Sequence, residues 1–318
     1  MEKQMKIAAE IFKKYGLDFE TAERAGGWTN AVWLNGGLAL RLAKETGSDR
    51  IRREVERSKV FPASVGYPKN IAVGVTEGYE WSLSERVQGQ VLSSVWNDLT
   101  WSEKVKAVKQ IIEMVNGVHA TPVGEVEHLT LKTAWYNSFD RDQSLADIAR
   151  YVAKGLFTSE QGRNLHDALE RFYEWNVSVT PVLCHGDMTT DNLLWHDGDV
   201  VSLLDFEHAV IATPQLDVHS VANLALVPYD EVASMDRILM KEQNHEIEEY
   251  VAEIISLLKP FLSTQSDKDL FLGYNILFRQ RFLEFWLAGS DDDMKKCDAY
   301  QKMLSFSDGN GGYLSDLF

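Results

Sequence analysis

The chain has 318 residues, of which 45% are apolar, and a formal net charge of −16 at pH 7. This length and apolar content are enough for about two domains' worth of core. The acidic balance argues against a nucleic-acid-binding surface, because phosphate backbones are held by clustered Lys and Arg. It is compatible with a cationic small substrate, although acidity that serves solubility alone is the simpler explanation.

The sequence also argues against a membrane or secreted protein. No stretch approaches the ~20 apolar residues of a membrane span, and residues 1–16 form a charged amphipathic helix without an apolar secretory core. The two cysteines, Cys184 and Cys297, are too few for a disulfide scaffold. Because Cys184 falls in an expected buried strand, we predict a reduced, cytoplasmic protein without membrane partners, either a monomer or a dimer.

The first third of the chain predicts a small β-sheet. Residues 25–33 have the pattern of a strand, a glycine turn and a second strand, and a turn at 35–37 leads into a third strand at 38–42. Glycines beside a hydroxyl-bearing residue let backbone N–H groups approach phosphate oxygens closely. Residues 49–61 then have helical spacing of apolar side chains, and residues 81–87 predict a further strand.

A long helix is predicted at 100–119. Its apolar residues recur at helical spacing, Thr100 or Ser102 can cap its start, and Pro122 follows its end. We expect this helix to form core. Its last residue, His119, is more simply explained as a structural histidine at a helix end than as a catalytic one.

The segment 182–207 carries the strongest signal in the chain. Within it, two apolar runs at 193–195 and 200–204 flank the pair Asp197-Gly198. An Asp-Gly pair between apolar runs strongly predicts a β-hairpin, because glycine accepts the positive φ that tight turns need.

Three oxygen-bearing side chains are expected to meet at the open end of this hairpin. Antiparallel pairing places Asn192 beside Asp205, and Asp187 lies five positions before Asn192 on the incoming loop. Such a group suits a hard divalent cation together with a catalytic base. Phosphoryl transfer from a nucleotide needs both. The alternative is an Asp-rich surface hairpin that binds nothing.

The order of these residues resembles that of a known enzyme family. An Asp, four residues, an Asn, and then Asp-Phe after a hairpin is the layout of protein kinases. Here His-Gly-Asp at 185–187 and Asp-Phe-Glu at 205–207 depart from that layout. These departures resemble the aminoglycoside phosphotransferase and choline kinase-like family, which are small-molecule kinases with a protein-kinase-like fold. The resemblance implies an α+β protein with a small, sheet-rich nucleotide-binding lobe (residues 1–87) and a larger, mainly helical catalytic and substrate-binding lobe (residues 88–318).

The resemblance also implies roles for the residues around the hairpin. Asp187 would be the catalytic base, while Asn192 and Asp205 would hold Mg²⁺. His185 would brace the catalytic loop. Asp217 matches a family position that supports this loop through His185 or the local backbone, although an Asp at a helix start also caps the helix without a catalytic role.

In the first lobe, the resemblance implies a nucleotide site. Arg41 stands on the third strand, where protein kinases have a Lys, and Glu54 is its expected partner on the next helix. An arginine can fork onto phosphate oxygens and a carboxylate together; the alternative is an exposed Arg41 and a solvated Glu54. The resemblance places the nucleobase against the main chain of residues 84–87. Main-chain contacts leave almost no trace in the sequence, so the choice between ATP and GTP is not predicted. An ordinary linker explains these residues nearly as well. The nucleotide-binding candidates are Gly27, Thr29, Asn30, Arg41, Glu54, Ser84, Glu85 and Val87.

The predicted function is transfer of the γ-phosphoryl of ATP or GTP, with Mg²⁺, to a hydroxyl of a small molecule. The favoured acceptor is an aminoglycoside-like or other antibiotic. A metabolic kinase acting on homoserine, choline, a methylthio-sugar or a fructosamine-type glycated amine stays open, as does, with less weight, a nucleotide-binding pseudokinase. A protein-substrate kinase is disfavoured, because no Ala-Pro-Glu signature follows residues 205–207 and the segment 211–214 leaves little room for an activation loop.

Near the C-terminus, four glutamates are predicted to share one helix face because of their 4-3-4 spacing. A solvated face of an amphipathic helix explains them more simply than an acidic wall that receives substrate amines. Residues 271–287 are dense in aromatic side chains, for which core packing is the simplest explanation. The four glutamates are Glu242, Glu246, Glu249 and Glu253.

Overall fold

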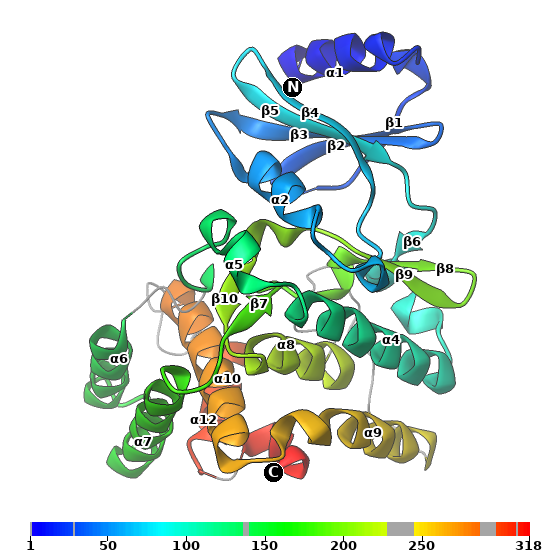
Figure 1. Cartoon of the computed structure of the whole chain (residues 1–318). Coiled ribbons are helices and arrows are strands. Elements are labelled where there is room, and N and C mark those ends of the chain that lie inside the picture. The colour runs from blue at the N-terminus through cyan, green and yellow to red at the C-terminus, as the bar shows by residue number, and fades with distance from the viewer. Residues whose placement is uncertain (1, 28, 136–139, 228–244, 287–296, 310) are drawn as a thin grey trace.

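The protein is described by a computed structural model in which a sheet-rich lobe sits above a mainly helical one (Figure 1). The chain therefore has the two-lobed α+β architecture that the resemblance implied. The structure describes residues 2–27, 29–135, 140–227, 245–286, 297–309 and 311–318. Within these ranges, the side chains of residues 245–247, 285, 286 and 313 are not described.

The upper lobe is built on a five-stranded antiparallel sheet, in the order β1-β2-β3-β5-β4. Successive residues of a strand point to opposite faces, so Leu40 and Leu42 face one side and Arg41 faces the other. Helix α1 (Glu2–Lys14) covers the first side, with Phe12 packed against Leu40 and Leu42. The strands are β1 (Glu23–Ala25), β2 (Asn30–Asn35), β3 (Leu38–Thr46), β4 (Asn70–Thr76) and β5 (Tyr79–Glu85).

Helix α2 (Arg50–Ser58) covers the other face of this sheet and lies between it and the lower lobe (Figure 1). Its residues Ile51 and Val55 pack on Ala43 of β3. Glu80 of β5 holds the start of the helix, because its carboxylate accepts the backbone N–H of Ile51 at 2.9 Å. The helix therefore presents Glu54 toward the junction of the two lobes.

Two small sheets carry the loops of the lower lobe. One is the three-stranded sheet β6-β8-β9, and the other pairs β7 with β10. Because β6 directly follows the upper lobe, its pairing with β8 ties the connection between the lobes to the 193–203 hairpin. The strands are β6 (Gln90–Val91), β7 (Val182–Cys184), β8 (Leu193–His196), β9 (Asp199–Leu203) and β10 (Val210–Ala212).

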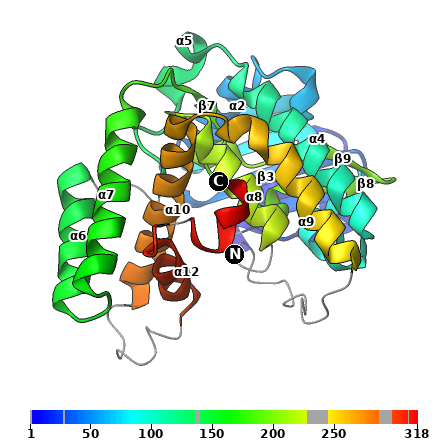
Figure 2. The same cartoon turned by 90° about the horizontal axis from the view of Figure 1, so that it is seen from below.

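The helices of the lower lobe share one continuous apolar core. Helix α8 (Gln215–Leu226) is buried over nearly its whole length and lies among α4, α9 and α10, as Figure 2 shows from below. Helix α4 begins with a capping box between Thr100 and Glu103, so Thr100 is the cap of the two candidates, Thr100 and Ser102, that the sequence offered. The helices are α3 (Leu92–Val95), α4 (Trp101–His119), α5 (Val123–Val126), α6 (Arg141–Ala153), α7 (Ser159–Asn176), α8, α9 (His245–Leu258), α10 (Gln265–Trp286) and α12 (Asp298–Phe306).

The predictions for the C-terminal part of the chain concern the aromatic segment 271–287 and four glutamates. Phe271 and Phe278 of α10 are buried in the core, as expected. Of the four glutamates, Glu249 and Glu253 are exposed on α9, whereas Glu242 and the side chain of Glu246 lie outside the described residues. Within the described part of the chain, no helix combines the length and the apolar content needed to cross a bilayer.

Candidate active site

The predicted catalytic loop leaves the short buried strand β7 through a glycine. Gly186 has φ of +79°, and a Cβ added there would lie 2.4 Å from the carbonyl oxygen of His208. Only glycine fits this position, because its backbone is left-handed and the neighbouring backbone is too close for a side chain. The tight turn places Asp187 beyond the end of the strand.

His185 joins this loop to the loop that carries Asp205. Its Nε2 donates a hydrogen bond to the carbonyl oxygen of Leu204 at 2.8 Å, and its Nδ1 accepts the backbone N–H of Asp187 at 3.2 Å. These two bonds fit a neutral imidazole with its proton on Nε2. The ring also packs against Phe206 with centroids 4.5 Å apart. The predicted brace therefore has the geometry to fix both loops relative to each other.

Asp217, at the start of α8, holds the same loop from behind. Its Oδ2 accepts the backbone N–H of His185 at 2.9 Å, and its Oδ1 accepts that of Gly186 at 3.0 Å. The imidazole of His119 lies 3.0 Å from Oδ2. Burial alone would raise the pKa of Asp217, but the hydrogen bond and charge of His119 outweigh it and lower the pKa. Asp217 thus supports the loop through its backbone.

The 193–203 hairpin is confirmed. The two residues of its turn, Asp197 and Gly198, both have positive φ, 49° and 85°. At the open end, the N–H of Leu204 donates to the carbonyl oxygen of Asn192 at 2.8 Å. Asp205 follows directly in a left-handed conformation (φ 59°, ψ 69°), so it emerges next to Asn192 as the pairing predicted.

Asp187, Asn192 and Asp205 come together at this end. The side-chain amide of Asn192 donates to the backbone carbonyl of Asp187 at 2.9 Å and lies 3.5 Å from its carboxylate. One carboxylate oxygen of Asp205, Oδ1, is buried without a hydrogen-bond partner in the described part of the chain. A buried carboxylate oxygen without a partner is unfavourable unless a cation or another ligand occupies the site.

The electrostatics of these acids point to the same conclusion. Burial, followed by the negative charge of Glu54, raises the pKa of Asp205 to about 7. Burial also raises the pKa of Asp187, although the charge of His208 opposes it. Crowded carboxylates with raised pKa values are stabilised by a divalent cation, for which oxygen atoms are the preferred ligands. Mg²⁺ therefore fits the donor set of Asn192 and Asp205.

Arg41 and Glu54 meet at the junction of the lobes. Two hydrogen bonds of 2.8 and 2.6 Å join the guanidinium of Arg41 to the carboxylate of Glu54. Glu54 also accepts the hydroxyl of Tyr67 at 2.8 Å and the backbone N–H of Phe206 at 3.2 Å. Burial would raise the pKa of Glu54, but Arg41 and these donors lower it to about 2. One buried carboxylate therefore connects Arg41 to the loop of Asp205.

The glycine turn between β1 and β2 is held closely against the sheet. A Cβ added to Gly27 would lie 2.4 Å from the carbonyl oxygen of Asn30, so this position also favours glycine. The ammonium of Lys44 donates to the carbonyl oxygen of Gly27 at 2.8 Å, and the side-chain amide of Asn30 donates to the hydroxyl of Thr29 at 3.2 Å. Trp28 lies outside the described residues. Lys44 thus supports this turn and does not replace Arg41.

Two of the residues expected to contact the nucleobase, Ser84 and Glu85, are held in the sheet at the end of β5. Ser84 is paired with strands on both sides, β3 and β4. The N–H of Glu85 already donates to the carbonyl oxygen of Lys69 at 2.9 Å. Both residues are therefore engaged in the sheet, and Val87, which follows the strand, is the candidate whose backbone lies outside it.

An aromatic cluster lies beside the catalytic loop. The ring of Trp135 is 6.1 Å from that of His208 and 5.8 Å from that of Phe282, and Phe278 lies 4.9 Å from Phe282. His208 is the residue whose carbonyl contacts Gly186, and its charge acts on Asp187. Aromatic walls beside a catalytic group are typical of small-molecule sites.

A second group of possible metal ligands, His119, Cys184 and Asp217, has its ligand atoms within 4.8 Å of one another. Burial and the charge of Asp217 raise the pKa of the Cys184 thiol well above its usual range, so the sulfur stays protonated. A protonated thiol is a poor ligand, and Asp217 already accepts three hydrogen bonds. This group is therefore part of the support of the catalytic loop.

The comparison with family models decides the class of the protein. Residues 20–258 match the model of the phosphotransferase enzyme family, which is most of the chain. The chain belongs to this family. Aminoglycoside 3'-phosphotransferase of Escherichia coli is 23% identical over 184 residues, which cover 57% of this chain and 66% of that relative, just under two thirds of its length.

Solved structures of phosphotransferases share the fold of this family member. The GDP complex of aminoglycoside 2'-phosphotransferase-IIIa superposes with a TM-score of 0.62 at 17% identity, covering 97% of this chain and 98% of that one. A thermostable aminoglycoside phosphotransferase APH(4)-Ia variant, with ADP and hygromycin B, gives a TM-score of 0.60 at 15% identity, covering 95% and 98%. The predicted family and the two-lobed fold are thus confirmed.

Three contacts of the candidate site were not predicted from the sequence. Tyr67 supports Glu54, and His119, which we interpreted as a structural residue of α4, holds Asp217. Arg57 is fully buried and donates to the carbonyl oxygens of Leu129 and Phe206. Each acts on a partner far away in the sequence, so no local motif marks it.

Proposed function

We propose that this protein transfers the γ-phosphoryl of ATP or GTP to a hydroxyl of a small molecule, with an aminoglycoside-like antibiotic as the acceptor. The observation that carries the proposal is the bridge made by Glu54, which binds Arg41 and the backbone of Phe206 together. Through this bridge, the guanidinium of Arg41, which would bind the phosphates, lies at a fixed place relative to Asp205. Phosphoryl transfer depends mainly on such positioning and on charge stabilisation.

In the proposed reaction, Asp187 acts as the base. Its carboxylate accepts the proton of the acceptor hydroxyl while the hydroxyl oxygen forms a bond to the γ-phosphorus. The bond between that phosphorus and the bridging oxygen breaks, and the nucleoside diphosphate leaves with the electron pair. The raised pKa of Asp187 makes its carboxylate a stronger base than an exposed aspartate. His185 and Asp217 keep the carboxylate in place through the loop backbone.

Asn192 and Asp205 would hold the magnesium ion. When bound, Mg²⁺ neutralises the negative charge of the phosphates. The buried oxygen of Asp205 without a partner in the described chain, together with its raised pKa, supports this assignment. The side-chain amide of Asn192 donates its N–H to Asp187, which leaves its amide oxygen available as a ligand.

The nucleotide would lie under the sheet of the upper lobe. The turn of Gly27, Thr29 and Asn30 would contact the phosphates through backbone N–H groups, and Arg41 would pair with phosphate oxygens from the other side. The backbone from Val87 onward would contact the base. The related structures hold GDP in one case and ADP in another, so both nucleotides belong in the test.

The acceptor would lie against the aromatic cluster beside Asp187. Trp135 and Phe282 are half-buried, and flat faces of this kind suit the C–H faces of sugar rings. The curated relative is an aminoglycoside phosphotransferase, and one structural neighbour holds hygromycin B. An antibiotic-resistance role in the cytoplasm follows from this proposal, and two unpaired, buried cysteines are compatible with a reducing compartment.

A screen of nucleotide consumption tests the proposal. The purified protein is incubated with ATP or GTP, with and without Mg²⁺, against panels of aminoglycosides, macrolides and small metabolites that carry hydroxyl groups. We expect Mg²⁺-dependent turnover with an aminoglycoside and a phosphorylated product by mass spectrometry. Turnover with homoserine, choline or a methylthio-sugar instead would make it a metabolic kinase. Tight nucleotide binding without turnover on any panel would indicate a pseudokinase.

A further inference from the structure

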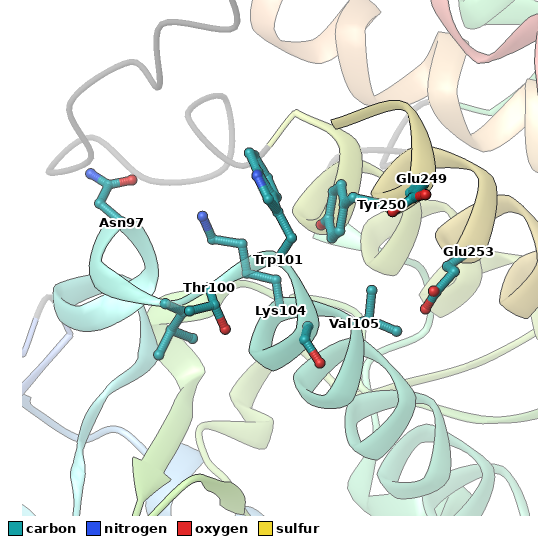
Figure 3. Close-up of a pocket in the computed structure, with 10 residues that line it drawn as sticks. Asn97, Thr100, Trp101, Lys104, Val105, Glu249, Tyr250 and Glu253 are labelled. Atoms are coloured by element: carbon teal, nitrogen blue, oxygen red, sulfur yellow. The ribbon is translucent and has the colours of Figure 1, made fainter. Parts of the chain in front are cut away.

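A pocket lies at the start of helix α4, whereas the last residue of that helix, His119, contacts Asp217 behind the predicted catalytic loop. Figure 3 shows the residues that line this pocket. It has a volume of about 760 Å³, within the range of small-molecule sites. Its walls come from the start of α4 and the segment before it, on one side, and from α9 on the other. The residues that line it include Asn97, Trp101, Lys104, Glu249, Tyr250 and Glu253.

Lys104 is the unusual residue of this pocket. Its side chain is only 4% exposed, yet its ammonium makes no hydrogen bond or ion pair with any described residue. It lies over two indole rings instead, 4.3 Å from the centroid of Trp101 and 5.9 Å from that of Trp96. Burial lowers the pKa of Lys104, and among the described residues no charged neighbour opposes this change. A largely buried lysine whose ammonium contacts only rings among the described residues can be stabilised further by an anion.

The aromatic walls of the pocket are fixed before any ligand arrives. Trp101 is the first residue of α4, which the capping box of Thr100 and Glu103 holds in place. Tyr250 of α9 packs against Trp101 with centroids 4.9 Å apart, and its hydroxyl donates to the carbonyl oxygen of Ala225 at 2.6 Å. A preformed pair of rings of this kind suits a flat or apolar ring, because little ordering is needed on binding.

We propose that this pocket is a binding site for a ring-bearing organic anion, with a carboxylate or phosphate on Lys104 and the ring against Trp101 and Tyr250. Asn97 lines the same pocket as Lys104, and its side-chain amide can donate a hydrogen bond to a bound anionic group (Figure 3). Glu253 lies on the opposite wall and repels an anion that approaches from α9.

The site is separate from the catalytic centre. His119, at the far end of α4, contacts Asp217 behind the catalytic loop. Lys104 and His119 are separated along the same helix by a distance on the order of 20 Å, from the rise of 1.5 Å per residue. A ligand on Lys104 therefore does not share the pocket of the nucleotide or the acceptor.

The first experiment measures binding by titration calorimetry with benzoate, phenyl phosphate and benzylamine, using the full-length protein. We expect both anions to bind and benzylamine to bind at least about tenfold more weakly, because its charge has the wrong sign for Lys104. Binding of benzylamine as tight as that of benzoate, or no binding of either anion, would overturn the proposal.

Variants locate the site. Lys104→Met keeps the length of the side chain and removes the charge, so anion affinity should fall at least about tenfold, since charge-assisted bonds are the strong ones. Lys109→Met on the exposed face of α4 is the matched control and should bind like the wild type. Glu253→Gln should strengthen anion binding about twofold, because it removes a like charge from the far wall. Wild-type affinity in Lys104→Met would contradict the proposal.

A measurement on the wild type does not depend on the folding of a variant. Limited acetylation with acetic anhydride, read by peptide mass spectrometry, reports how reactive each lysine is. Benzoate should protect Lys104 at least severalfold and leave Lys109 unchanged. Equal labelling of Lys104 with and without benzoate would argue against the site, even if calorimetry detected binding elsewhere in the protein.

Discussion

Asp205 and Asp217 are two buried carboxylates of the same lobe whose surroundings are opposite. Asp217 accepts three hydrogen bonds, from His119 and two backbone N–H groups, and its pKa is lowered. Asp205 keeps one oxygen without a partner in the described chain, and burial with the charge of Glu54 raises its pKa to about 7. The carboxylate of Asp217 has all its hydrogen-bond partners within the protein, whereas that of Asp205 leaves one oxygen available for a ligand. We therefore propose that the first supports structure and the second supports chemistry.

The largest expected effect is the loss of turnover on substitution of Asp205. Asp205→Asn removes the charge that the proposed Mg²⁺ needs, so turnover should fall on the order of 10³-fold, as when one charge-stabilising group is lost from an active site. The melting temperature should stay the same or rise, because an unfavourable buried charge is removed. Steady-state kinetics and calorimetry of the same sample check both. A variant that unfolds instead would make Asp205 a structural residue like Asp217.

Asp217→Asn should show the reverse pattern in stability. In Asp217 both carboxylate oxygens accept backbone hydrogen bonds, from His185 and Gly186. An asparagine has only one side-chain oxygen, so the substitution leaves one of these two N–H groups without an acceptor. Because bonds to charged groups are strong, the free energy of unfolding should fall by about 3 kcal/mol, which urea denaturation measures. Nucleotide affinity should change little in the folded fraction, since Asp217 touches only the loop backbone and His119. An unchanged urea midpoint would remove the distinction between the two acids.

The pH dependence sharpens the same comparison. A carboxyl whose pKa is raised by folding holds its proton more tightly in the native state, so its contribution favours folding below pH ~4, the unfolded-state pKa. That contribution is lost as the pH rises to about 7, the value for Asp205. Between pH 4 and 7, wild type without Mg²⁺ should lose about 3 kcal/mol relative to Asp205→Asn. Chemical denaturation at several pH values in chelator tests this, and parallel curves for the two proteins would contradict it.

The smallest expected effect concerns the support of Glu54. Tyr67→Phe removes the hydroxyl that donates to Glu54 at 2.8 Å and accepts a longer bond from Arg41 at 3.4 Å, and it keeps the ring that packs on Phe206. Stability should fall by about 1 kcal/mol, the usual value of one hydrogen bond. The KM for nucleotide should rise more than kcat falls, because Arg41 is less well held. Phe61 packs against Tyr67 and Phe206. Phe61→Leu alters this packing without removing a hydrogen bond to Glu54 and is a matched control.

The sequence was informative where the chemistry is local. The hairpin at 193–203 was predictable because Asp197 and Gly198 adopt the positive φ that their residue types favour. The start of α4 at Trp101 followed from the capping chemistry of Thr100. The two-lobed fold and the pairing of Arg41 with Glu54 came from the resemblance, which rested on the order of residues in 182–207.

Contacts between distant segments were not predictable. The close approach of the His208 carbonyl to Gly186, and the bond between His119 and Asp217, depend on how β7, β10, α4 and α8 pack together. The engagement of Glu85 with Lys69 likewise depends on a neighbouring segment of the sheet. Side chains act here through tertiary contacts, which residue spacing does not encode.

The most direct test of the central claim is the turnover of Asp187→Asn. The substitution keeps the shape of the side chain and removes only its ability to accept a proton, so nucleotide affinity and melting temperature should match the wild type. With Mg²⁺, nucleotide and the acceptor found in the screen, turnover should fall by about 10²- to 10⁴-fold, the range for a general base. Turnover equal to that of the wild type would contradict the assignment of Asp187 as the base and, with it, the proposed mechanism.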